Sequence, residues 1–189
     1  MAIDGFIGRE ELLRKVGCIC KRKFTNDIGL VRNINHVVNV NKDILVLYAE
    51  ARYSLIGTSA ILPDSLGKLA KLLKVPVVTL NMHGNYLNSP CWNLTDRGNR
   101  IEAEMAQVIT KEQIKTLTYE QINNCISNAL IYDEYAWQKE NNIRIKYENK
   151  AKGLHKVLYQ CPCCLTEFQM ESDKDRIWCK TVRQRMDYV

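Results

Sequence analysis

The chain has 189 residues, a formal net charge of +6 and a pI near 8.9, and 46% of its residues are apolar. That length suits one ordinary domain with an appendage, and the apolar fraction is sufficient for a core. The mild basic charge favours an anionic partner, whether a phosphate, a phospholipid surface or a nucleic acid. No run of about 18 apolar residues is present, which argues against a membrane span, and charged residues interrupt any signal peptide at the start. We therefore expect a cytoplasmic protein, in which the cysteines are reduced thiols or metal ligands rather than disulfides.

Amphipathic patterns predict two helices before the first long strand, at residues 5–16 and 27–40. Between them, residues 17–20 form a short apolar run that we expect to be a strand. Its two cysteines have C-x-C spacing, which is not the C-x-x-C of a zinc site, so we interpret both as small core residues. The basic run 21–23 that follows is either a solvated face or an anion site at a strand end.

Residues 44–87 are the centre of the predicted fold. Two apolar runs rich in β-branched residues, 44–48 and 75–80, are typical of strands buried on both faces. Between them, residues 64–73 place leucines along one helical face and begin with a capping residue. A strand, a helix and a second strand in this order form a βαβ unit with parallel strands. We therefore predict an α/β domain over residues 1–152, with a mainly parallel sheet flanked by helices.

The following segments extend this domain. Residues 103–109 predict a further strand. Thr110 and Thr118 each begin a capping-box pattern with a glutamine three residues later, which predicts two helix starts. Residues 132–151 carry charged and aromatic side chains at helical spacing, which predicts a helix whose aromatics pack. His83 lies just past a predicted strand end, where it has either a structural role or a place facing a site.

The tail, residues 153–189, contains an incomplete zinc-ribbon pattern. Cys161 and Cys164 form one knuckle, and Cys179 opens a second. Tetrahedral Zn²⁺ takes four sulfur or nitrogen ligands, and Val182 stands at the fourth position. Cys163 does not easily substitute, because its side chain leaves the knuckle in another direction. We therefore predict a small zinc-ribbon-like appendage with a structural site that lacks one ligand and binds zinc poorly or not at all.

Three blocks in the first half of the chain resemble motifs of the glycerolipid acyltransferase family, typified by 1-acyl-sn-glycerol-3-phosphate acyltransferases. A block of glycine, apolar residues and arginine is matched by residues 17–22, GCICKR. The family's Phe-Pro-Glu-Gly-Thr-Arg-Ser block is matched by residues 47–54, LYAEARYS, and its Val-Pro-Val block by residues 75–78. The order and spacing of all three blocks make the resemblance specific.

The resemblance implies transfer of a fatty acyl group from acyl-CoA or acyl carrier protein to a lysophospholipid hydroxyl, at the inner face of a membrane. It implies that Arg22 binds the acceptor phosphate, Glu50 contacts the acceptor, Arg52 adds charge and Ser54 shapes the loop. Within the second block, alanines replace the family's proline and glycine, and the arginine comes one place early. A thioester donor needs no cofactor for this reaction, so zinc would be structural only.

The family's catalytic block, a histidine followed after four residues by an aspartate, has no match. In that block the histidine removes the proton from the acceptor hydroxyl, and the aspartate orients the imidazole. The residues five positions after the three histidines are Asn41, Asn88 and Gln160. Because this block precedes the others in the family, we expect the chain to be a piece of a longer enzyme that is inactive alone.

A second class of function stays open: a small basic α/β protein whose ribbon-like tail binds nucleic acid or protein. The net charge and the cysteine knuckles fit it. However, no aromatic-plus-basic pattern marks a base-stacking surface, and Glu50 has no role in such a protein. Acyl transfer is therefore the preferred interpretation, and nucleic acid is not an expected partner.

Overall fold

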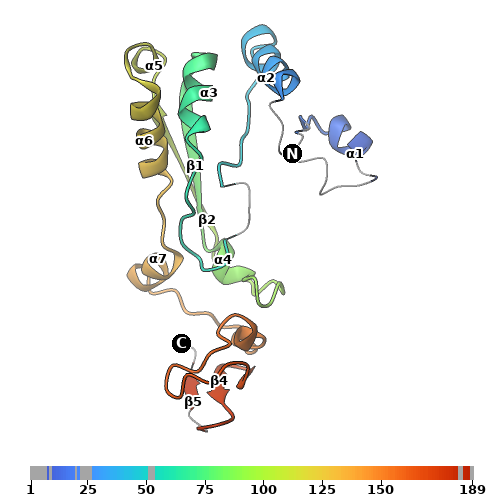
Figure 1. Ribbon diagram of the computed structural model, residues 1–189, viewed down its shortest axis with the longest axis vertical. Coiled ribbons are helices and arrows are strands. Elements are labelled where there is room, and N and C mark those ends of the chain that lie inside the picture. The colour runs from blue at the N-terminus through green and yellow to red at the C-terminus, as the bar shows by residue number, and fades with distance from the viewer. Residues whose placement is uncertain are drawn as a thin grey trace.

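The computed structural model describes residues 8, 10–19, 21, 27–50, 54–182 and 185–187. It is a mixed helix and strand structure with one two-stranded and one three-stranded antiparallel sheet (Figure 1). The elements, in chain order, are α1 Glu10–Lys15, α2 Ile28–Asn35, the π-helical η2 His36–Val40, α3 Ser65–Leu73, β1 Val77–His83, α4 Asn85–Asn88, β2 Glu102–Ile109, α5 Gln113–Thr116, α6 Tyr119–Ala129, α7 Glu134–Glu140, the 3₁₀ turn η3 Leu154–Lys156, β3 Met170–Asp173, β4 Arg176–Cys179 and β5 Arg185–Asp187.

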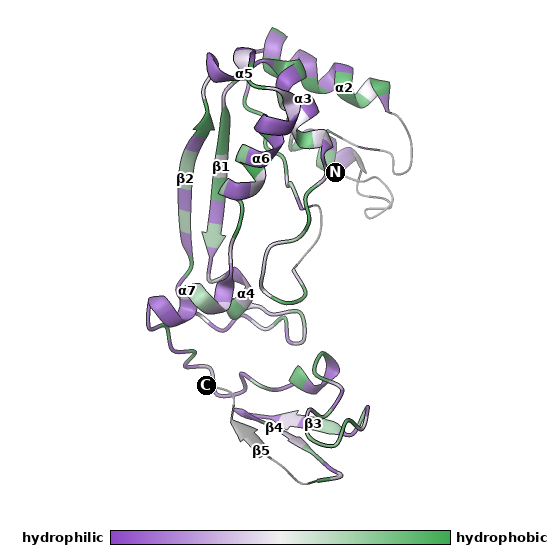
Figure 2. Ribbon diagram, turned by 60° about the vertical axis from the view of Figure 1, so that its left-hand side comes forward, coloured by the Kyte–Doolittle hydropathy of each residue, from purple (hydrophilic) through white to green (hydrophobic). Residues whose placement is uncertain are grey.

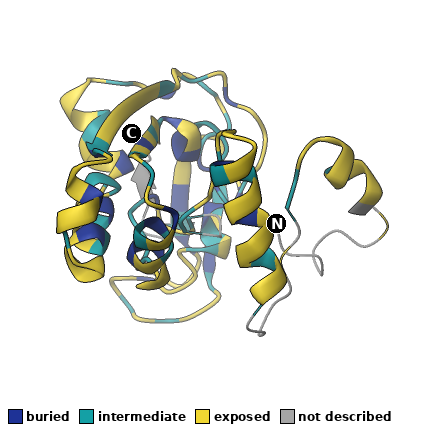
Figure 3. Ribbon diagram, turned by 90° about the horizontal axis from the view of Figure 1, so that it is seen from above, coloured by how far each residue is buried: buried dark blue, intermediate teal, exposed yellow. Residues whose placement is uncertain are grey.

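One core cluster lies between the β1–β2 pair and the helices α3, α5 and α6. Figure 2 shows α3 and α6 on one side of the two strands, and Figure 3 shows α1 standing apart from the rest of the fold. Leu66 and Ala70 of α3 pack with Ile122 and Ile126 of α6, and Ile109 ends β2 in the same cluster. The buried face of α3 therefore carries Leu66 and Leu73 of the predicted leucine stripe, whereas Leu72 is 55% exposed.

Several sequence predictions are confirmed by the local structure. The helix predicted for residues 64–73 is α3, and the strand predicted for residues 103–109 is β2. Thr118 and Gln121 form a reciprocal capping box at the start of α6. Thr110 and Gln113 exchange the same pair of hydrogen bonds before α5. Both capping boxes depend on residues three positions apart, which is why the sequence alone predicts them.

The predicted parallel sheet is wrong for the described strands. Residues 44–48 form neither helix nor strand, and Ile44 is 90% exposed. The strand predicted at 75–80 begins and ends later, as β1, and it pairs antiparallel with β2. A parallel strand needs cover on both of its faces, whereas α3 and α6 lie on one side of this sheet. Pairing of β1 with β2 also closes a shorter loop than pairing across the α3 crossover would.

Two further predictions need correction. Residues 17–19 of the predicted strand 17–20 are not a strand, and Cys20 lies outside the described residues. The helix predicted over residues 132–151 is limited to α7, and turns follow it. Asn142 adopts a positive φ of 51° directly after α7. A left-handed residue at that place ends the helix, as asparagine commonly does at a helix C-terminus.

The tail forms its own small sheet, in which β4 pairs with β3 and with β5. Met170 of β3 stands opposite Cys179 of β4. No helix in the described part of the chain is long and apolar enough to cross a membrane.

The close contact between α3 and α6 makes a stability prediction. A Cβ atom added to Gly67 would lie 2.1 Å from the backbone oxygen of Tyr119 and 2.9 Å from Cβ of Asn123. Gly67→Ala must therefore push the two helices apart, and we expect it to destabilise the protein by about 1–3 kcal/mol. Gly29→Ala is the control, because Gly29 of α2 is exposed and a Cβ atom there would meet only the side chain of Asp27, at 3.3 Å. Urea unfolding midpoints that fall equally for both variants would contradict this expectation.

Candidate functional site

Three cysteines of the tail form one compact cluster. Cys161 and Cys164 lie in a tight turn, in which the backbone N–H of Leu165 donates to the oxygen of Cys161 at 2.9 Å. Cys179 ends β4. Cys161 and Cys179 are buried, and Cys164 is half-buried. The turn and the hairpin thus bring together the three predicted metal ligands, although Cys179 is fifteen residues beyond Cys164 in the sequence.

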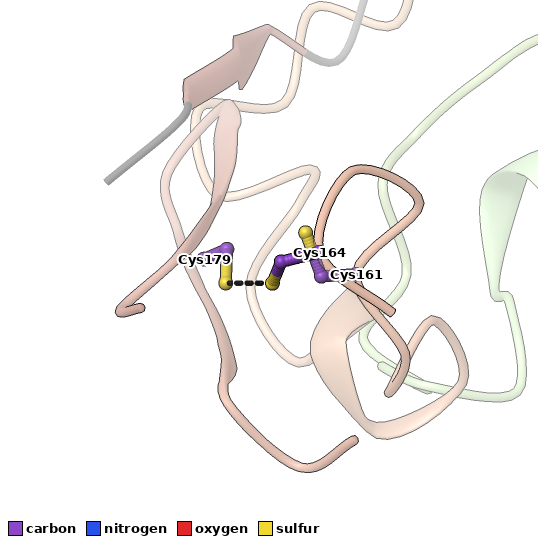
Figure 4. A group of neighbouring side chains, drawn as sticks. All are labelled: Cys161, Cys164 and Cys179. Carbon is purple, nitrogen blue, oxygen red and sulfur yellow. Dashed lines mark hydrogen bonds between the residues drawn. The ribbon is translucent and has the colours of Figure 1, made fainter. Parts of the chain in front are cut away.

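The sulfur atoms have the spacing of metal ligands. All three lie within 4.8 Å of one another, and Cys164 Sγ is 3.7 Å from Cys179 Sγ (Figure 4). A tetrahedral zinc ion with Zn–S bonds of about 2.3 Å holds its sulfur ligands about 3.8 Å apart. The described residues therefore include a group that could hold a metal ion, and its spacing fits zinc.

The fourth position does not carry a ligand. Val182 stands there and is 41% exposed. Cys163, although it lies between two members of the cluster, is exposed, and among the described residues the cluster consists of Cys161, Cys164 and Cys179. A metal ion held by these three sulfurs would complete its coordination with water or another small ligand.

The surroundings of Cys164 favour the thiolate that a metal needs. Hydrogen bonds with the side chain and backbone of Thr166 lower the pKa of the Cys164 thiol to about 7. The Cys164 Sγ and Thr166 Oγ1 atoms are 3.2 Å apart. Because thiolates, not thiols, bind metal, less proton release is needed at neutral pH than for an ordinary cysteine.

A second candidate site comprises Glu50 and the loop that begins at Ser54. The backbone N–H of Ala60 donates to Glu50 Oε1 at 3.2 Å. Ser54 Oγ accepts from the N–H of Gly57 at 2.9 Å and donates to the oxygen of Thr58 at 3.2 Å. Two side chains of the second motif block thus hold the turn that follows it. Arg22 and Arg52, the predicted cationic residues of this site, lie outside the described residues.

The segment before α7 holds this loop in place. The N–H of Tyr132 donates to Ser59 Oγ at 2.6 Å, and the N–H of Ser59 donates to the oxygen of Tyr132 at 3.1 Å. The N–H of Glu134 donates to the oxygen of Gly57 at 2.9 Å. The loop is therefore fixed at its backbone by a segment that is more than seventy residues away in sequence.

A buried carboxylate beside this segment, that of Glu134, is not predicted by the sequence. Glu134 is 1% exposed and accepts a hydrogen bond from the N–H of Gly84. Burial raises the pKa of its carboxyl group above the usual value. His83 stacks on Trp137 with ring centroids 5.3 Å apart. In sequence, Glu134 follows the N-cap Asp133 and looks like an ordinary acidic residue of a first helical turn, so no local pattern marks it as buried.

Comparison of the chain with protein-family models, with curated proteins and with solved structures finds no match. Its function is therefore inferred from its own residues and their arrangement.

Proposed function

We propose that this chain is the acceptor-binding part of a glycerolipid acyltransferase, joined to a tail that binds zinc through three cysteines. The order and spacing of the three motif blocks at residues 17–22, 47–54 and 75–78 carry this proposal. Two observations support it. The second block is followed by a turn that Ser54 holds in shape, and the net charge of +6 suits a phosphate-bearing lipid.

In the proposed reaction, the acceptor hydroxyl of a lysophospholipid attacks the thioester carbon of acyl-CoA or acyl carrier protein, and the thiol leaves. Arg22 binds the phosphate of the acceptor, with Arg52 adding charge. Glu50 contacts the glycerol part of the acceptor. The proton of the attacking hydroxyl must pass to a base, and none of the three histidines is followed by the aspartate that the family's base uses.

Vesicle binding tests the acceptor site. Arg22→Ala is expected to weaken binding to phosphatidylcholine vesicles containing lysophosphatidic acid by about 10-fold or more, because charge-assisted hydrogen bonds to phosphate contribute about 1.5–3 kcal/mol. Arg32→Ala, which removes an exposed arginine from α2, is the matched control. Flotation of the protein with vesicles at several lysophosphatidic acid contents measures the effect.

Two outcomes contradict the acceptor assignment. Equal weakening by both arginine variants would mean that general charge, not a site, causes the binding. Binding to mixed nucleic acids in electrophoresis, with no binding to vesicles, would instead support the basic protein with a nucleic-acid-binding tail.

The metal part of the proposal is a structural zinc in the tail. The 3.7 Å separation of the Cys164 and Cys179 sulfurs supports it, together with the burial of Cys161 and Cys179. Because the three ligands come from separate parts of the tail, a bound metal would add to the folding free energy of the tail. Zinc has no role in the acyl transfer itself.

A further inference from the structure

The tail packs against the body of the protein and shares a hydrophobic core with the loop around α4. Trp92 and Tyr86 from that loop are buried in one cluster with Cys161 and Cys179 of the metal group, and Tyr86 and Trp92 meet edge to face with ring centroids 5.8 Å apart. The further members of the cluster are Ala151, Leu154, Met170 and Ile177. Two metal ligands therefore belong to the same packed unit as two aromatic rings of the body.

The backbone that leads into the tail, and Gly153 at its start, contact the same loop. Arg97 Nη2 donates to the oxygen of Lys150 at 2.7 Å, and the guanidinium of Arg97 lies 5.6 Å from the ring centroid of Trp92. Gly153, with a φ of 90°, approaches so closely that a Cβ atom there would lie 2.6 Å from the oxygen of Trp92. Such an approach is possible only for glycine. Trp92 is thus held by the start of the tail.

On its other side, this loop holds the turn that follows Ser54. The Tyr86 hydroxyl donates to the oxygen of Leu55 at 2.8 Å. The turn is closed at Gly57, where an added Cβ atom would lie 2.7 Å from the Tyr86 ring. The same Gly57 donates its N–H to Ser54 Oγ. Tyr86 is therefore a direct contact between the aromatic pair and the candidate acceptor loop.

We propose that Tyr86 is a positioning residue for the Ser54–Thr58 turn, and that metal binding by Cys161, Cys164 and Cys179 tightens this turn through Trp92 and Tyr86. This inference rests on the proposed function in taking the turn as part of an acceptor site. Its physical basis is the metal dependence of a small ribbon. When the tail loosens, Trp92 loses the packing of Cys161, Leu154 and their neighbours, and Tyr86 loses a rigid partner.

Hydrogen exchange of the full chain, with zinc and with a chelator, tests the proposal without any lipid. Zinc is expected to slow amide exchange in residues 54–60 by about 2- to 10-fold, the factor that corresponds to one net hydrogen bond. Residues 119–129 of α6, which pack in a separate cluster, should show no change. Cys179→Ser should abolish both zinc binding and the response of residues 54–60. Cys125→Ser, an exposed cysteine on α6, is the matched control and should retain both.

Tyr86→Phe separates positioning from general packing. It keeps the ring against Trp92 and removes the hydroxyl that donates to Leu55, so zinc should still bind while the response of residues 54–60 is reduced. Tyr119→Phe, which removes an exposed hydroxyl, should leave the response unchanged. The proposal is overturned if the unaltered chain binds no zinc, if zinc binds without slowing exchange in residues 54–60, or if Tyr86→Phe responds as fully as the unaltered chain. A zinc response without lysophosphatidic acid binding would leave the coupling intact and remove only the acceptor assignment.

Discussion

Val182→Cys is expected to raise the zinc affinity of the tail by about 10²- to 10³-fold. Structural zinc sites with four ligands bind with about 10–16 kcal/mol at neutral pH, so one ligand of four contributes about 2.5–4 kcal/mol. Val182 stands three positions after Cys179, where the second cysteine of a C-x-x-C knuckle would be, and its side chain is partly exposed. A cysteine there adds a thiolate without overfilling a core. Competition with a chromogenic chelator measures the affinity, and limited proteolysis of the tail should slow in parallel.

Val182→Ala is the matched control for this experiment, because it removes the valine without adding a ligand. If the unaltered chain already holds one zinc as tightly as a four-ligand site, a fourth ligand is present and the interpretation of an incomplete ribbon is wrong. Cys163→Ser would then identify the source. A loss of zinc affinity in that variant would show that Cys163 is the fourth ligand, and no loss would indicate that a residue of the body supplies it.

The purified chain is expected not to acylate lysophosphatidic acid at the rate of an enzyme that has the histidine and aspartate block. A positioned general base contributes about 10²- to 10⁴-fold to rate. None of His36, His83 and His155 has an aspartate five positions on, and His155 Nδ1 lies 2.8 Å from Ser172 Oγ in the tail. Release of free thiol from acyl-CoA in the presence of lysophosphatidic acid measures the reaction.

A complementation experiment tests whether the chain becomes active when the missing block is supplied. Adding a separate fragment that carries the histidine and aspartate block of a related enzyme should restore acyl transfer, and Arg22→Ala should reduce the restored rate. Turnover by the chain alone at the rate of a complete enzyme would contradict the prediction. It would require a base elsewhere, and His83, stacked on Trp137 near the buried Glu134, would be the first residue to replace.

The features that the sequence determined by itself are local ones. The capping boxes before α5 and α6 need a threonine and a glutamine three residues apart. The cysteine knuckle needs two residues between Cys161 and Cys164, and a hairpin to bring in Cys179. The capping residues, and the two cysteines of the first knuckle, are close in sequence, so little chain entropy opposes these contacts. Cys179 is fifteen residues beyond Cys164 and reaches it through the β3–β4 hairpin.

The tertiary structure decided which strands pair and which side chains are buried. Residues 44–48 have the composition of a buried strand, yet all of them except the half-buried Leu45 are exposed, because burial depends on a covering layer supplied by other parts of a fold. Glutamate is usually a surface residue, yet Glu134 is buried. The N–H of Gly84, fifty residues away, donates a hydrogen bond to its carboxylate. The packing of Trp92 against the cysteine tail is of the same kind. Such contacts join segments far apart in the chain, and their free energy depends on the shape and polarity of both partners, which no single stretch of sequence contains.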